Sequence, residues 1–117
     1  MRLIEALQVV KSARDRKYVL VNRAGEMFWG RSRDTMIGKT TPEVFAPQEA
    51  AKIEQRETEL LAAGKPIFDE REMVTPTQGT RTIYARRLAI KDKNGDDAYI
   101  LGVVDDVTER RAADARI

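Results

Sequence analysis

Short runs of alternating hydrophobic and polar positions recur along the chain, and each run predicts a β-strand. β-Branched and aromatic residues fill these runs, and turn-forming residues bound them, as is usual for strands. The first two runs are separated by an Asp-Arg-Lys turn, and an Asn-Gly pair lies between the last two. Both connections favour hairpins. The predicted strands cover residues 8–13, 18–22, 67–75, 80–90 and 98–106.

Between the second and third predicted strands, the pattern changes to short helical segments. Asn22 suits a helix N-cap, because its side-chain oxygen can accept an otherwise unpaired backbone N–H. We expect a short helix over residues 23–29 that stops near Gly30. A second short turn should begin at Ser32, another capping residue, and end at Gly38.

Two further helices are predicted before the third strand. Thr41 precedes Pro42, which is the order of a cap followed by a first helical residue. The one long helix opens at Pro47 and closes at Gly64 and Pro66. Its apolar face consists of Ala50, Ile53, Leu60 and Leu61.

The order of these elements predicts an α+β fold. A helical lead-in over residues 1–8 is expected first, because Leu3, Ile4 and Leu7 have helical spacing. Two strands, several helices and three strands follow. The natural packing is a five-stranded antiparallel sheet with the helices on one face and a small interior between the two layers.

Composition and charge exclude several classes of function. The 117 residues suit one domain, and 21 basic residues among 19 acidic ones give a net charge of only +2. The basic residues form no one-sided stripe, so we expect no nucleic-acid binding. No apolar run approaches the roughly 18 residues of a membrane span, so this segment should make no membrane contact. A cytoplasmic location is expected.

The chain contains neither cysteine nor histidine. Their absence removes disulfides, cysteine nucleophiles, histidine general bases and imidazole metal ligands from its chemistry. No convergent catalytic set is visible among the remaining polar residues. We therefore expect no enzymatic activity in this segment and no metal site.

Several residues are candidates for the wall of a ligand cavity. Phe28, Trp29 and Met36 lie on the short helices, where they either pack in the core or border a cavity. Tyr84 and Arg86 lie two apart on one strand and share a face. If that face points inward, Arg86 needs an acid or a ligand carboxylate as partner. If it points outward, both are surface residues.

The C-terminal segment changes abruptly from an apolar strand to a charged helix. Asp106 and Glu109 have the spacing of a capping box, and Thr108 is an alternative cap. A helix over residues 108–117 would be a frayed end or a stiff connection toward another domain.

Three stretches of the sequence resemble a PAS domain with its C-terminal PAC region. They read YVLVNRAGEMFWGRSRDTMIGKT, LLAAGKPIFDEREMV and LGVVDDVTERR, and Asp106-Val107-Thr108 matches the closing motif of that family. The resemblance implies a domain over residues 9–107 followed by an output helix. It implies a cytoplasmic sensory or dimerisation module attached to an effector such as a histidine kinase or a cyclic-di-GMP enzyme. Asp106, Thr108 and Glu109 would couple the sheet to that helix.

The resemblance leaves two functional hypotheses in addition to the weaker enzyme hypothesis. A ligand-sensing module would have a cavity bounded by Phe28, Trp29, Ile53 and Tyr84. The cofactor of such a module stays unknown, although a cysteine-linked flavin and a histidine-ligated haem are disfavoured. A small organic ligand, such as an acid, or no ligand at all remains. An interaction module would instead form a homodimer through the outer sheet face. The residues expected there are Leu3, Ile4, Leu7, Leu101 and Val103.

Overall fold

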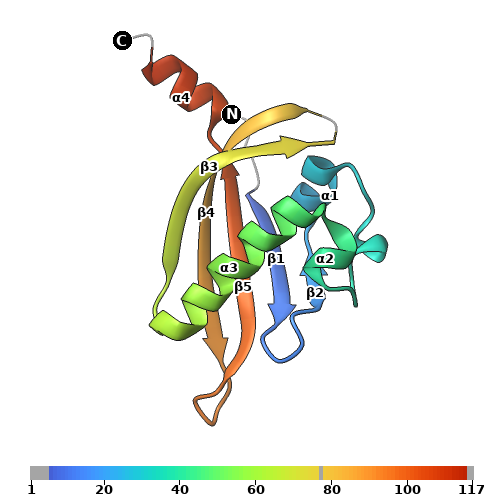
Figure 1. The fold of residues 1–117 in the computed structure, drawn as a ribbon, viewed down its shortest axis with the longest axis vertical. Coiled ribbons are helices and arrows are strands. Elements are labelled where there is room, and N and C mark those ends of the chain that lie inside the picture. The colour runs from blue at the N-terminus through green and yellow to red at the C-terminus, as the bar shows by residue number, and fades with distance from the viewer. Residues whose placement is uncertain (1–5, 77, 116–117) are drawn as a thin grey trace.

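A five-stranded antiparallel sheet forms the frame of the protein in the computed structural model, which describes residues 6–76 and 78–115. The strand order is β2-β1-β5-β4-β3, so the first and last strands of the chain are neighbours in the centre of the sheet (Figure 1). The strands are β1 (Leu7–Ser12), β2 (Tyr18–Val21), β3 (Ile67–Thr75), β4 (Gly79–Lys91) and β5 (Asp97–Asp106).

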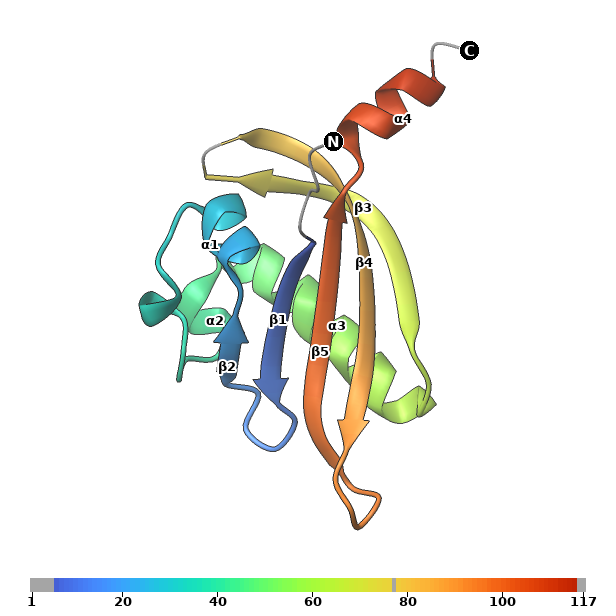
Figure 2. The same ribbon diagram turned by 180° about the vertical axis from the view of Figure 1, so that it is seen from behind.

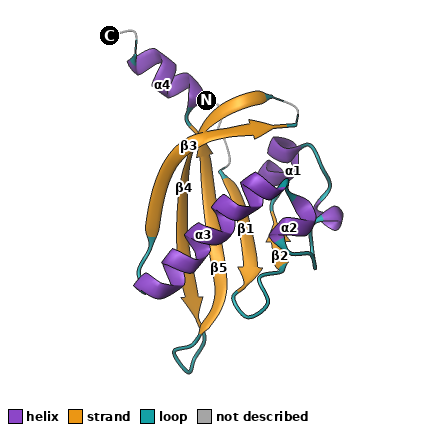
Figure 3. Cartoon of the chain, viewed as in Figure 1, coloured by secondary structure: helices purple, strands orange, loops and turns teal. Residues whose placement is uncertain are grey.

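The helices between β2 and β3 cover one face of this sheet, as the sequence predicts (Figures 1 and 3). They are α1 (Arg23–Trp29), the 3-10 turn η1 (Arg33–Thr35), α2 (Thr41–Val44) and α3 (Pro47–Ala63). The long helix α3 crosses the sheet obliquely. In the view from behind, none of the helices within residues 6–76 and 78–115 lies over the opposite face (Figure 2). The last helix, α4 (Thr108–Asp114), continues from the end of β5 and leaves the sheet.

Local capping signals account for most helix boundaries. The Asn22 side chain accepts a hydrogen bond from the Gly25 N–H at 3.0 Å, which confirms it as the cap of α1. Gly30 and Gly64 end α1 and α3 with φ of 65° and 69°, a left-handed conformation that glycine adopts without a steric penalty. The Ser32 side chain caps η1 by accepting from Asp34.

The predicted boundaries at α2 and at the N-terminal lead-in are wrong. The cap of α2 is Thr40 rather than Thr41, because Glu43 accepts hydrogen bonds from the Thr40 N–H and hydroxyl and completes a capping box. The helical lead-in does not extend to residues 7 and 8, which belong to β1. Leu7 pairs with Val104 of β5 and is buried, so sheet pairing outweighs the local helical spacing. Residues 1–5 lie outside the described residues.

The main core lies between the sheet and the helices. Its aromatic part is ordered by edge-to-face packing, with the Trp29 and Phe45 ring centroids 5.2 Å apart. Its buried members are Leu7, Tyr18, Val21, Phe28, Trp29, Met36, Met73 and Ile83. The buried face of α3 consists of Ala50, Ile53, Glu57 and Leu60, and the carboxylate on this face marks the site described next.

Candidate functional site

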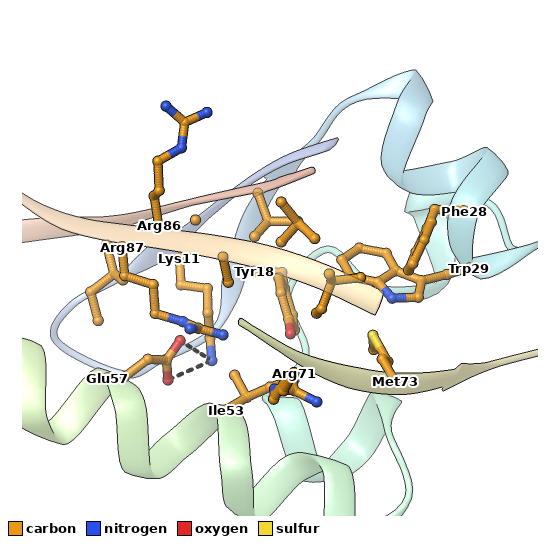
Figure 4. A pocket seen from close by; sticks show the side chains of 16 residues that line it. Lys11, Tyr18, Phe28, Trp29, Ile53, Glu57, Arg71, Met73, Arg86 and Arg87 are labelled. Atoms are coloured by element: carbon orange, nitrogen blue, oxygen red, sulfur yellow. Dashed lines mark hydrogen bonds and ion pairs between the residues drawn. The ribbon is translucent and has the colours of Figure 1, made fainter. Parts of the chain in front are cut away.

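A small cavity lies between the sheet and α3. Its volume is about 40 Å³. The cavity therefore has room for only a few heavy atoms. Side chains from all five strands, α1 and α3 border it, and both apolar and charged groups face it (Figure 4).

A buried ion pair between Lys11 of β1 and Glu57 of α3 forms one polar side of the cavity. The Lys11 Nζ lies 2.9 Å from Glu57 Oε1 and 2.8 Å from Oε2, and both side chains are about 2–3% exposed. The same ammonium donates to the Thr41 hydroxyl, which lies 3.2 Å from the Tyr18 hydroxyl. Burial lowers the pKa of Lys11, and the nearby Glu57 only partly offsets this. Burial also raises the pKa of Tyr18, so this phenol is neutral.

Two arginines, one on β3 and one on the neighbouring strand β4, form a second polar side of the cavity. Arg87 of β4 is 8% exposed and donates from Nη1 to Asp69 Oδ1 at 3.2 Å. Arg71 of β3 donates two hydrogen bonds to the Glu49 carboxylate of α3. One runs from Nη1 to Oε1 at 3.0 Å and the other from Nη2 to Oε2. Burial lowers the pKa of Arg87. Both guanidinium groups on this side are therefore paired with carboxylates, which offsets the cost of burying their charge.

Four of the six residues that the sequence suggests for the cavity border it in the structure. They are Phe28, Trp29, Ile53 and Arg86. Met36 does not line it and is fully buried in the core, so the core interpretation of this residue fits its position.

The shared face of Tyr84 and Arg86 points outward, which settles the alternative left open by the sequence. Tyr84 stacks on Phe68 at 6.3 Å between ring centroids. Arg86 borders the cavity, but its guanidinium points away from it (Figure 4). This guanidinium meets Asp105 at 3.2 Å. The inward arginine is its neighbour Arg87, because alternate strand residues face opposite sides.

Lys11, Glu57, Arg71 and Arg87 are the charged residues of the cavity that sequence reasoning missed. A positional signal existed for two of them. Lys11 follows Leu7 and Val9 in the inward phase of β1, and Glu57 lies at helical spacing within the apolar face of α3. Charged residues at inward positions of both partners indicate a buried pair, because neither charge is tolerated there alone.

A compact set of polar contacts joins β5 to α4. The Asp106 carboxylate accepts from the Thr108 N–H at 3.0 Å and from the Thr108 hydroxyl at 2.6 Å. Arg81 of β4 donates to Asp106 at 2.7 Å and to both Glu109 oxygens at 2.7 and 2.8 Å. The Thr82 N–H of β4 donates to the Thr108 hydroxyl at 2.8 Å. Asp106, Thr108 and Glu109, which the sequence suggests for coupling the sheet to the helix, therefore all contact β4 in this one cluster.

The N-cap residue of α4 is not the one that the predicted capping box contains. Val107, rather than Asp106 or Thr108, is the N-cap residue, and its side chain makes no capping bond. Asp106 remains in β5 because strand pairing with Ile83 of β4 extends to it. Its carboxylate nevertheless accepts a hydrogen bond from the Thr108 N–H, the first backbone N–H of α4. A second contact, from Arg111 Nη2 to Glu70 Oε1 at 2.7 Å, holds α4 to β3.

Asp106→Ala is expected to lower the free energy of unfolding by about 0.5–2 kcal/mol at neutral pH, because the Thr108 N–H loses its acceptor. Although burial acts to raise the pKa of Asp106, hydrogen bonds from Arg81 and Thr108 hold it below the ordinary value of 3.8. The contribution is therefore present above that pH and is lost as the pH falls through the folded-state pKa. Urea unfolding of the wild type and the variant at pH 7 and pH 3 measures the loss of stability and its dependence on pH.

Asp105→Ala is the matched control for this substitution. Asp105 is the preceding residue of β5 and makes one half-exposed ion pair with Arg86. Such pairs contribute roughly 0–1 kcal/mol. Equal losses for the two variants, or a loss for Asp106→Ala that is the same at both pH values, would contradict the assigned role.

The described residues contain no group of three or more acidic, histidine or cysteine side chains placed to hold a metal ion. Within residues 6–76 and 78–115, no helix is both long enough and apolar enough to cross a membrane.

Comparison with known proteins gives consistent matches over most of the chain. Residues 3–112 match the family described as the PAS fold. The methanogenesis regulatory histidine kinase FilI of Methanothrix harundinacea is 27% identical over 97 residues, which are 83% of this chain and 11% of that protein. The chain thus spans only 11–12% of the length of the curated relatives it matches.

Solved structures show the same arrangement. The PAS domain of BvgS from Bordetella pertussis is 26% identical, with a TM-score of 0.79 over 95% of this chain and 83% of that one. A sensory box sensor histidine kinase from Vibrio cholerae is 21% identical, with a TM-score of 0.77 over 90% of this chain and 83% of that one. The second match shows the fold alone.

Proposed function

The chain belongs to the PAS-fold family, and from this premise we propose that it receives a small-molecule signal in its cavity and relays it through α4 to an effector. It is a sensory domain related to those of histidine kinases. The proposed effector is a histidine kinase, with a cyclic-di-GMP enzyme as the other option. The output chemistry then lies outside this segment, and the module acts in the cytoplasm.

The observation that carries this proposal is that residues lining the cavity lie next to the polar contacts that join β5 to α4. Ile83 of β4 lines the cavity and pairs in the sheet with Asp106. Val104 of β5 also lines the cavity, two residues before Asp106. A shift of these strands on ligand binding would therefore act directly on the contacts that hold Thr108 and Glu109. Discrete hydrogen bonds at such a joint favour two distinct positions of the helix.

Native mass spectrometry of the purified chain, followed by denaturation and small-molecule analysis, tests the sensory function. The expected result is a compound bound at one copy per chain and released on unfolding. A bare polypeptide, together with no binding from a library of small organic compounds, would contradict a sensory cavity. An unknown cofactor would be found by the same measurement.

The outer sheet face supports a second candidate, an interaction module that forms a homodimer. An apolar row crosses four paired strands on this face, and no described element covers it. The row consists of Leu20, Val10, Leu101 and Leu88. Val103 shares the outer face with Leu101, as expected from the sequence. Leu7 does not, since it is buried on the inner face, and residues 3 and 4 are outside the described range.

Leu101→Glu is expected to convert a dimer into a monomer if the outer face is the interface, because it places a charge in the middle of the apolar row. Met27→Glu is the control, since Met27 is exposed on α1 over the other face. Sedimentation velocity measures the change. A wild-type chain that stays monomeric at high concentration would exclude the homodimer for this segment.

A further inference from the structure

An apolar groove lies beside the cavity, between α1, α2, the start of α3 and the end of β3. Its volume is about 300 Å³, whereas that of the cavity is about 40 Å³. Sites for small organic molecules begin at roughly 300 Å³. Apolar walls of the groove include Val44, Phe45 and Pro76, and Trp29 and Met73 line both the groove and the cavity. The groove, unlike the cavity, therefore has room for an organic molecule.

The indole N–H of Trp29 is a buried donor at this groove. Trp29 is 6% exposed, and its Nε1 has no hydrogen-bond partner within residues 6–76 and 78–115. Figure 4 shows this nitrogen on the side of the ring nearer Met73 and away from Lys11 and Glu57. An unpaired buried donor costs free energy, and native structures rarely keep one without a reason. An acceptor atom of a molecule in the groove would supply the missing partner.

Aromatic contacts hold the indole ring in this orientation. The Trp29 ring packs edge-to-face against Phe28 and Phe45, with ring centroids 6.2 and 5.2 Å apart. Such pairs contribute favourably beyond the area they bury. Turning the ring toward another acceptor within the fold would disrupt both contacts. The acceptor therefore has to come to the indole N–H.

The charged side chains that line the groove are already paired. Glu49 accepts from Arg71 through both carboxylate oxygens. Arg31 donates from Nη1 to the Val44 carbonyl at 3.0 Å and from Nε to the Thr35 hydroxyl at 2.8 Å. A charged ligand would lose water here and gain no unpaired counter-charge, so its binding would be costly. An uncharged ligand avoids this cost.

The β3 side of the groove is connected to the junction at α4. Met73 pairs in the sheet with Arg81 of β4. Arg81 donates to Asp106 at 2.7 Å and to Glu109 at 2.7 Å. A molecule that packs against Met73 would therefore act on the strand pair that positions Arg81.

We propose that the groove binds an uncharged, mainly apolar molecule with one hydrogen-bond acceptor, such as a carbonyl oxygen, that accepts from Trp29 Nε1. The apolar part of the molecule packs against Val44, Phe45 and Pro76. This proposal rests on the sensory function proposed above, names a class of ligand for it, and extends the ligand site from the cavity into the groove.

Cyclohexanone, methylenecyclohexane and cyclohexanecarboxylate test the ligand class, because they share a six-membered ring and differ in acceptor and charge. Trp29 is the only tryptophan in the chain, so NMR spectra contain a single indole N–H signal. Cyclohexanone should move this signal downfield, and methylenecyclohexane should not. The carboxylate should bind at least about tenfold more weakly than the ketone. Amide signals of Val44, Ala46 and Thr75, which line only the groove, should shift more than that of Ile100, which lines only the cavity.

Trp29→Phe separates the hydrogen bond from the packing. The ratio of the affinities for cyclohexanone and methylenecyclohexane should fall by about two- to tenfold in this variant, which corresponds to one neutral hydrogen bond. Val44→Ala is the control, because Val44 lines the groove and its side chain has no donor. It should weaken both compounds alike and leave the ratio unchanged. Calorimetry measures the affinities.

The Nε–H signal of Arg81 reports the relay in the same spectra, because this group donates to Asp106 at 2.7 Å. Binding of cyclohexanone should shift it. An indole shift without a change at Arg81 would overturn the relay and leave the groove site in place.

The remaining outcomes distinguish the ligand class from the sensory function. An unchanged indole signal, tighter binding of the carboxylate, or an affinity ratio that survives Trp29→Phe would overturn the proposed ligand class. The same holds if none of the three probes binds while another class of compound co-purifies, and the sensory function then stands. If no compound binds or co-purifies, both proposals fail.

Discussion

Glu57→Ala is expected to lower the free energy of unfolding by about 3–5 kcal/mol, the largest loss for any single substitution considered. The variant leaves Lys11 buried, with the Thr41 hydroxyl as its remaining hydrogen-bond partner and the Tyr18 ring 4.9 Å from its ammonium. An unpaired ammonium in an apolar interior is far less stable than in water. Urea unfolding at neutral pH measures the loss. The loss should become smaller as the pH rises, because Lys11 then releases its proton and is neutral, so that no unpaired charge remains buried.

Two variants sharpen this experiment. Glu59→Ala removes a carboxylate two residues later on the same helix, where it pairs with Arg56 at 2.8 Å in an exposed position, and should cost at most about 1 kcal/mol. Lys11→Met combined with Glu57→Leu removes both buried charges and should recover most of the lost stability. Similar losses for Glu57→Ala and Glu59→Ala would contradict the buried pair.

Met36→Ala is expected to cost about 2–5 kcal/mol, the second largest effect. Met36 is 0% exposed and packs in the main core, so truncation leaves a hole that the neighbouring side chains fill only in part. Because Met36 does not line the cavity, ligand preference should stay unchanged wherever the variant is folded.

Met27→Ala is the control of the same residue type. Met27 is 64% exposed, and its truncation should change stability by no more than about 0.5 kcal/mol. Equal effects of the two methionine variants, or a changed ligand preference in Met36→Ala, would show that Met36 belongs to the cavity wall instead.

The elements of this fold were largely predictable because their signals are local. The Asn22 cap and the Gly30 and Gly64 stops lie next to the residues they organise, and α1 and β3 have the predicted boundaries. The one-residue error at α2 arose because Thr40 and Thr41 offer equivalent hydroxyls. Only the position of Glu43 distinguishes them.

The charged part of the site was less predictable because it depends on pairing between distant segments. Lys11 and Glu57 are 46 residues apart, and each on its own looks like a surface charge. The facing of Arg86 and Arg87 depends on the strand phase, and a shift of one residue exchanges them. Asp106 stays in β5 because of its pairing with Ile83, which a local capping pattern does not contain.

The central claim is that the cavity and α4 are coupled, and amide hydrogen exchange tests it most directly. The chain is compared as purified and after unfolding and refolding have removed any compound that co-purifies with it. Coupling predicts that exchange changes both in the strands around the cavity and at the Thr82, Val107 and Arg111 amides, which form or follow the junction. A change around the cavity with identical exchange throughout α4 would contradict the relay.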